Sequence, residues 1–267
     1  MLAKPNVSPD EQVIVLPEGT HHARRVIDRC RWRLKSFIEN DAYLLYDHLG
    51  VPDGAPSNTI LRHHLYSANA GMFARSSAVA WEAHLGRPLA RLGDIPVDLD
   101  LIEDEDGPVD AGLECLRDLV REITGTKGIT DMGASKMLHL TRPRFVAISD
   151  RYVRDRLAID VPWPAGLDRA DYCAARLVAV QRGMRALGKA NAATLDQLTQ
   201  YVNSLPPLTP GTEGQRMPGA YRANGKSIAV RLSKLRVLDI ILWTDVALLG
   251  PTPNPSWKAR FEQAFPA

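Results

Sequence analysis

Cysteine is scarce in this sequence. Three cysteines, Cys30, Cys115 and Cys173, lie far apart in a chain of 267 residues. They form neither a metal-type pair nor an even disulfide set, so the sequence predicts no disulfide framework and no cysteine-ligated metal. A reducing compartment, the cytoplasm, is the simple interpretation.

Long apolar runs are also lacking. No run approaches the ~20 residues that a membrane helix needs, so no membrane partner is predicted. The first ten residues have neither the basic start nor the apolar stretch of a secretory signal. The adjacent histidines at 21–22 and at 63–64 diverge by about 100° on a helix and do not chelate one metal. The chain contains no GxGxxG, P-loop or GxSxG motif, and we expect neither a metal nor a cofactor.

What is present is a helical pattern in an ordinary globular composition, with 45% hydrophobic and 24% charged residues. Apolar residues recur at helical spacing, and the one strand-like stretch, at 12–16, is weak. The sequence therefore predicts an all-α fold. We expect one compact domain over 21–250, a loose N-terminal segment over 1–20 and a C-terminal tail over 251–267. The oligomeric state is left open.

Local charge departs from the net charge of +2. Residues 24–35 hold six basic side chains against one acid, 126–156 hold seven against three, and 222–236 hold five with no acid. Such clusters indicate either a one-sided positive face for a nucleic acid or basic residues spread over solvated helix faces.

The segment 128–156, GITDMGASKMLHLTRPRFVAISDRYVRDR, predicts a helix-hairpin-helix, which we place at about 113–141. We expect a tight turn over 130–133, in which Gly133 permits a positive φ, and a second helix over 134–140. The free N–H groups at that helix start can hold a phosphate. Lys127, Ser135 and Lys136 flank it with donors, as binding of a DNA backbone requires.

This segment resembles the core of the helix-hairpin-helix DNA glycosylase superfamily. Gly133 matches the second glycine of the hairpin in that family, and Asp150 matches its catalytic aspartate at the start of the following helix. The resemblance implies a protein that binds duplex DNA and removes a damaged or modified base, a hydrolase of DNA repair. Arg142 and Arg144 would then help to hold the distorted strand.

Three positions depart from the family pattern. Asp131 replaces the first hairpin glycine and would repel a phosphate. Ser135 stands where bifunctional members carry a Schiff-base lysine, and Lys136 would point elsewhere on the helix. The departures favour a monofunctional glycosylase, in which Asp150 stabilises an oxocarbenium-like sugar, over a lyase. For Asp150 the alternative is a plain helix N-cap.

Other interpretations stay open. The chain also resembles an uncharacterised, mainly actinobacterial family by ASKMLHLTRPRF and LRVLDIILW. A non-enzymatic scaffold or interaction protein would bind DNA without catalysis or serve in phage defence. Alternatively, its basic patches would bind an acidic protein partner. Asp239, inside the second of these motifs, is expected to be partly buried. It would be either a second acid near the site or an ion-pair partner of an arginine on another helix.

Overall fold

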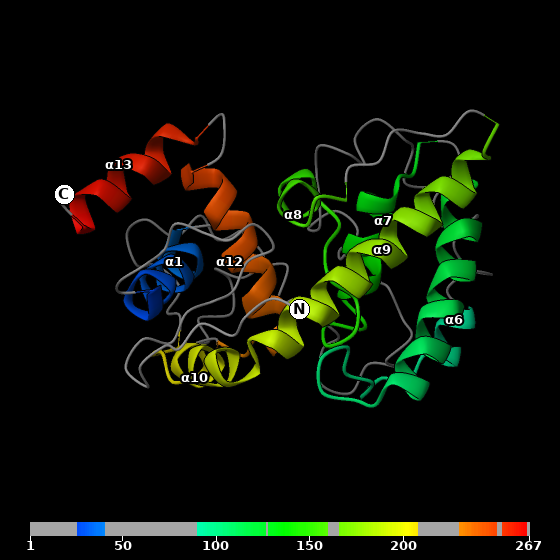
Figure 1. Ribbon diagram of the computed structural model, residues 1–267, viewed down its shortest axis with the longest axis horizontal. Helices are drawn as coiled ribbons and strands as arrows, with labels where there is room; N and C mark the ends of the chain where they lie inside the picture. Colours follow the sequence, from blue (N-terminus) through cyan, green and yellow to red (C-terminus); the bar gives the residue numbers. More distant parts are fainter. Residues whose placement is uncertain are drawn as a thin grey trace, which may run out of the picture.

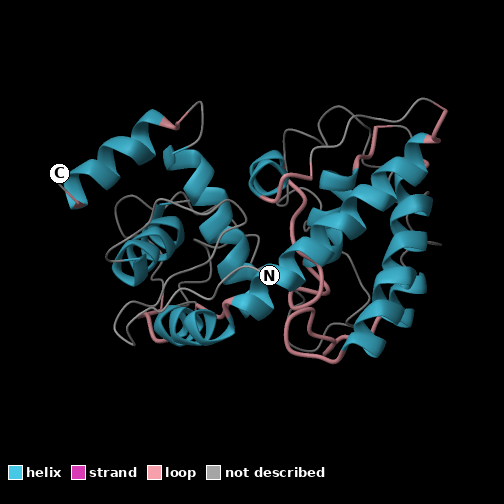
Figure 2. Ribbon diagram, viewed as in Figure 1, coloured by secondary structure: helices cyan, strands magenta, loops and turns pink. Residues whose placement is uncertain are grey.

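The fold is described by a computed structural model over residues 26–40, 90–126, 128–159, 166–207, 230–249 and 253–265. Every regular element in these ranges is a helix, and they contain no strand (Figure 2). The all-α prediction is confirmed for this part of the chain. The predicted N-terminal segment 1–20, the weak strand at 12–16 and Lys127 lie outside the described residues.

The elements follow one another in the order α1 (Val26–Asn40), η1 (Arg91–Asp94), α6 (Asp106–Thr124), α7 (Asp131–His139), α8 (Arg151–Arg156), α9 (Arg169–Ala190), α10 (Ala192–Asn203), α12 (Lys234–Leu249) and α13 (Pro255–Ala264).

The helices gather in two groups, which Figure 1 shows side by side. Helices α6, α7 and α9 pack together and form what we call the hairpin lobe; α1, α10, α12 and α13 form the second lobe. Helix α9 passes directly into α10 at Asn191 and so connects the lobes. The short helix α8 lies between them and packs against α12.

Apolar side chains of both lobes form one continuous buried cluster, from Leu34 of α1 through Leu116 of α6 to Leu238 of α12. Within this cluster, a glycine permits a close approach of two chain segments. A Cβ on Gly188 of α9 would lie 2.6 Å from the side chain of Ile102. Gly188 thus stands inside a helix that continues to Ala190.

The connection between α6 and α7 differs from the predicted turn. Helix α7 begins at Asp131, and Thr130 is its N-cap, whose hydroxyl accepts a hydrogen bond from the N–H of Gly133. The residue with a positive φ is Gly128, at +93°, so the chain reverses before Thr130. Gly133 therefore lies in the first helical turn, and the expected turn over 130–133 is wrong.

The predicted C-terminal tail contains a packed helix. Asn254 caps α13 by accepting from the N–H groups of Ser256 and Trp257, and Pro255 occupies the favourable first position. Trp257 is buried, with its ring edge-on to Trp32 at 6.1 Å and to Trp243 at 5.8 Å. The aromatic contacts attach α13 to α1 and α12.

Candidate functional site

Asp150 lies at the boundary of the two lobes, as the N-cap of α8. Its Oδ1 accepts a hydrogen bond of 2.9 Å from the N–H of Val153. The predicted helix cap is therefore present. The residue also lines a small cavity of about 30 Å³, which we call the interlobe cavity. Its lining residues come from both lobes and the segment before α8: Phe37, Lys136, Ile148, Asp150, Arg236, Asp239, Ile240 and Trp243.

Two acids and two bases share this cavity, and burial shifts the pKa values of three of them. Burial raises the pKa of Asp150, while its bond from Val153 and the charges of Lys136, Arg236 and Arg154 oppose that rise. Burial, with the charge of Asp150 as a smaller cause, raises the pKa of Asp239 to about 6. Burial lowers the pKa of Lys136. The cavity is thus a desolvated site in which the charges compensate one another.

Lys136 was expected to point elsewhere on the helix than Ser135, and it lies in the same cavity as Asp150. It is 8% exposed and lines the interlobe cavity together with Asp150. Asp239, 2% exposed, pairs with Arg236 one turn earlier on the same helix, so the expected partner on another helix is wrong. Asp239 also lines the interlobe cavity with Asp150, so the two acids are neighbours.

The start of α7 faces inward. Asp131 is fully buried and accepts hydrogen bonds from the guanidinium of Arg176 and from the hydroxyl of Ser149. Ser135 is also fully buried, with its hydroxyl donating to the carbonyl of Met132 and accepting from the N–H of Ser149. Ser135 is therefore committed to holding the segment before α8, and its predicted contact with phosphate does not fit this placement.

Gly133 is buried in the first turn of α7, where it is not presented as a hairpin glycine. The turn before it is bound from within the protein: Arg169 donates to the carbonyls of Thr124 and Ile129. Asp131 was expected to repel a phosphate. Its charge instead pairs with the partly buried arginines Arg176 and Arg154.

Arg142 and Arg144, two residues apart, have different environments. Arg142 is 2% exposed, and its guanidinium donates to the carbonyls of Leu92, Ile95 and Thr141. It binds the segment around η1 and is not presented to DNA. The side chain of Arg144 is half exposed and donates to Asp100 over 3.0 Å.

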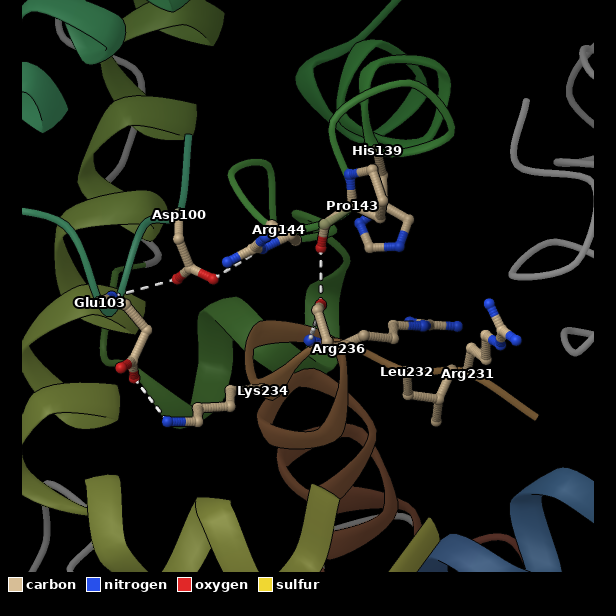
Figure 3. Close-up of a pocket in the computed structure, with 10 residues that line it drawn as sticks. Asp100, Glu103, His139, Pro143, Arg144, Arg231, Leu232, Lys234 and Arg236 are labelled. Atoms are coloured by element: carbon tan, nitrogen blue, oxygen red, sulfur yellow. Dashed lines mark hydrogen bonds and ion pairs between the residues drawn. The ribbon is translucent and has the colours of Figure 1, made fainter. Parts of the chain in front are cut away.

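Arg144 lines the second pocket, of about 560 Å³, which Figure 3 shows. We call it the basic pocket. Its lining residues are Asp100, Glu103, His139, Pro143, Arg144, Arg231, Leu232, Ser233, Lys234 and Arg236. Arg236 lines both the basic pocket and the interlobe cavity, so the two sites are neighbours.

Sequence reasoning missed Arg231, Lys234, Arg236 and His139 as site residues. The acid-free run 222–236 carried the signal, because three of its five basic side chains line the basic pocket. The basic patch at 126–156 lies partly inside the protein. Arg154 and Arg156 are 12% and 19% exposed and pair with the buried acids Asp131 and Asp245.

No group of three or more His, Cys, Asp and Glu side chains in the described ranges is placed to hold a metal ion. No helix in the described part of the chain is long and apolar enough to cross a membrane.

Comparison with known proteins gives a family and no function. No protein of curated function and no solved structure matches the chain. A family profile matches residues 67–209, more than half of the chain, and this span includes Lys136 and Asp150 but not α12. The chain therefore belongs to this family, which is described as a family of unknown function (DUF6308).

Proposed function

We propose that the protein is a helix-hairpin-helix DNA-binding protein that removes a damaged or modified base from duplex DNA, with Asp150 as the catalytic residue. One observation carries the proposal. Asp150, at the start of a helix that follows the α6–α7 pair, faces a desolvated cavity between two lobes and is surrounded by cations there. An aspartate that served only as a surface cap would have no such surroundings.

The surroundings suit the chemistry. Cleavage of the bond between base and sugar passes through an oxocarbenium-like sugar, and an ionised carboxylate beside it stabilises that charge and can orient water. The bond from Val153 fixes the orientation of the Asp150 carboxylate. The positive charges of Lys136, Arg236 and Arg154 favour its ionised form against burial.

A base must leave the duplex before Asp150 can act on its sugar. Phe37 and Trp243 line the same cavity and offer aromatic faces on which an extruded base can stack. Because ~30 Å³ holds about one water molecule, entry of a base requires α8 and α12 to move apart. Their packing across the boundary between the lobes is the contact that would open.

The small cavity also favours a second candidate function, a DNA-binding scaffold without catalysis. In that case Asp150 is an N-cap, and Lys136 and Arg236 compensate its buried charge. Asparagine caps a helix about as well as aspartate but cannot stabilise a cation. The substitution Asp150→Asn therefore separates the two functions without removing the cap.

The first experiment measures fluorescence anisotropy on two labelled duplexes, one intact and one with a central abasic-site analogue, at low and physiological salt. We expect the wild type to prefer the abasic duplex at physiological salt, because the analogue resembles the product. Asp150→Asn should keep this preference. In a screen of duplexes with modified bases, it should lower base release by roughly 10²–10⁴-fold.

The other outcomes are equally informative. Preference for the abasic duplex without base release from any duplex would support the scaffold. Weak, equal binding to both duplexes that disappears with salt would contradict both candidates, because it requires only a generic basic surface. If the wild type binds neither duplex even at low salt, DNA is not a ligand of this protein.

A further inference from the structure

The basic pocket has the size of a ligand site and an excess of positive charge. Its volume of about 560 Å³ lies in the range of small-molecule and cofactor pockets. Four permanent cations, from Arg144, Arg231, Lys234 and Arg236, line it against two carboxylates, from Asp100 and Glu103. A hollow lined mainly by one sign of charge concentrates the field and attracts the opposite charge.

The two carboxylates are already occupied. Asp100 accepts from Arg144 over 3.0 Å, and its other oxygen accepts from backbone N–H groups of the turn that follows it. Glu103 lies 2.7 Å from the amine of Lys234, which is also 2.5 Å from Asp196. The acids therefore neutralise Arg144 and Lys234 and leave the charge on the other side of the pocket.

That other side carries Arg231, Arg236 and His139. Figure 3 shows these three residues across the pocket from Asp100 and Glu103. Arg236 shares its charge with Asp239 below the pocket. Arg231 is exposed and makes no ion pair with any described residue. Arginine offers five N–H donors in a planar fork that matches a phosphate, so Arg231 is suited to bind one.

The walls of the pocket are fixed to one another. The hydroxyl of Ser233, just before α12, donates to the carbonyl of Pro143 over 2.8 Å (Figure 3). The carbonyl of Arg144 accepts from the N–H of Leu101 over 3.0 Å. Three segments far apart in the sequence are thus bound together around the pocket. The backbone segments that carry the cations are held in place before a ligand arrives, which lowers the entropy cost of binding.

We propose that the basic pocket binds a phosphate group, with Arg231 as its main contact. The inference deepens the proposed function and rests on it for the source of that phosphate, a DNA strand. Because Arg236 lines both sites, a phosphate in the basic pocket lies next to the cavity that holds Asp150. The pocket would then hold the backbone of the strand whose base is removed. A free phosphate ligand has the same chemistry and is tested separately.

The test compares the wild type with Arg231→Ala and a control, Arg117→Ala. Arg117 is half exposed on α6, does not line the pocket and pairs with Glu114 and Asp118. In the first arm, affinity for the abasic-analogue duplex is measured by anisotropy over a series of salt concentrations. In the second arm, binding of pyrophosphate is measured by calorimetry.

We expect Arg231→Ala to weaken DNA binding about 3- to 10-fold and to reduce the slope of log affinity against log salt by about 1. Arg117→Ala should leave both quantities unchanged. Asp150→Asn should keep the binding and its slope, because Asp150 is not a phosphate contact in this proposal. Loss of base release and loss of phosphate binding are thus separate results.

The remaining outcomes distinguish the two sources of phosphate. If the wild type binds pyrophosphate but not DNA, and Arg231→Ala abolishes this binding, the phosphate site is supported and the proposed function fails. If Arg231→Ala matches the wild type in both arms, the pocket binds no phosphate and the inference is overturned. A wild type that binds neither probe overturns both.

Discussion

Asp131, the first residue of α7, is fully buried and receives two hydrogen bonds from the guanidinium of Arg176 on α9. The pair joins the start of α7 to the long helix α9. Ser149 donates to the same carboxylate over 3.0 Å, one residue before Asp150. The orientation of the proposed catalytic segment therefore depends on a residue that was expected from the sequence to repel a phosphate.

Asp131→Asn should destabilise the protein strongly. The substitution keeps the size of the side chain but leaves Arg176, 17% exposed, without its carboxylate. Loss of one partner of a buried ion pair typically costs about 3–5 kcal/mol. Urea unfolding measures the change. Asp118→Ala is the control, because Asp118 is half exposed and 4.0 Å from its partners, and we expect less than ~1 kcal/mol there. Equal effects in the two variants would contradict the structural role of Asp131.

Substitution of Arg142 should affect stability, whereas substitution of Arg144 should affect DNA binding. Arg142→Lys loses the fork that reaches the carbonyls of Leu92 and Ile95, and each charged hydrogen bond left unmade costs about 1.5–3 kcal/mol. Arg144→Lys should change the free energy of unfolding by less than ~1 kcal/mol, because its pair with Asp100 is partly solvated. The same variant should weaken binding of the abasic-analogue duplex, since Arg144 lines the basic pocket and lysine keeps its charge but loses the planar fork that matches a phosphate. Unfolding curves and anisotropy on both variants check this, and a stable Arg142→Lys protein would contradict it.

The helical content could be predicted from the sequence because it depends on local periodicity. For example, Cys30, Leu34, Phe37 and Ile38 recur at helical spacing in the sequence, and all four are buried in α1. Positions whose role depends on a distant segment could not be predicted. Gly188 makes room for Ile102, 86 positions earlier in the chain, and the residues around Gly188 in the sequence do not indicate that contact.

The candidate site was predictable in part, for the same reason. The N-cap of Asp150 is a local feature and is present. The sequence could not show that Lys136, Asp239 and Arg236 share a cavity with it, because α7 and α12 meet only through the packing of the two lobes. Nor does residue type distinguish Arg142 from Arg144. Their roles differ because the carbonyls of Leu92 and Ile95 surround only the first.

The buried acid Asp239 should make the stability of the protein depend on pH. Its pKa in the folded protein is about 6, above the ordinary 3.8, so the folded state binds a proton that the unfolded chain releases between these values. This contribution to stability is fully present below pH ~4 and is lost as the pH rises through 6. Relative to Asp239→Asn, the wild type should therefore lose on the order of 3 kcal/mol between pH 4 and pH 7.

The measurement is urea unfolding of both proteins across this pH range. Three charged groups act on Asp239: Arg236 on its own helix and His139 lower its pKa, while Asp150 raises it. Asp150→Asn should therefore shift the loss of stability to lower pH. A stability difference between wild type and Asp239→Asn that stays constant from pH 4 to pH 7 would contradict the raised pKa.

Lys136 should act on Asp150 by its charge and not as a nucleophile. Its ammonium favours the ionised carboxylate, while burial raises the pKa of Asp150. Lys136→Met fills a similar volume without the charge, so the pKa of Asp150 should rise further. Base release needs the ionised form of Asp150. In the pH profile of base release, the acid limb should therefore move to higher pH in this variant. Arg117→Ala, outside the cavity, should leave the pH profile unchanged.

The alternative role of Lys136 has its own signature. Burial lowers the pKa of this amine, and a neutral amine beside an abasic sugar can form a Schiff base that borohydride reduces to a stable bond. We expect no covalent complex with an abasic duplex under borohydride, because the nearby charge of Asp150 favours the ammonium form. A covalent complex that Lys136→Met abolishes would make Lys136 the nucleophile of a lyase, in the cavity where the structure places it.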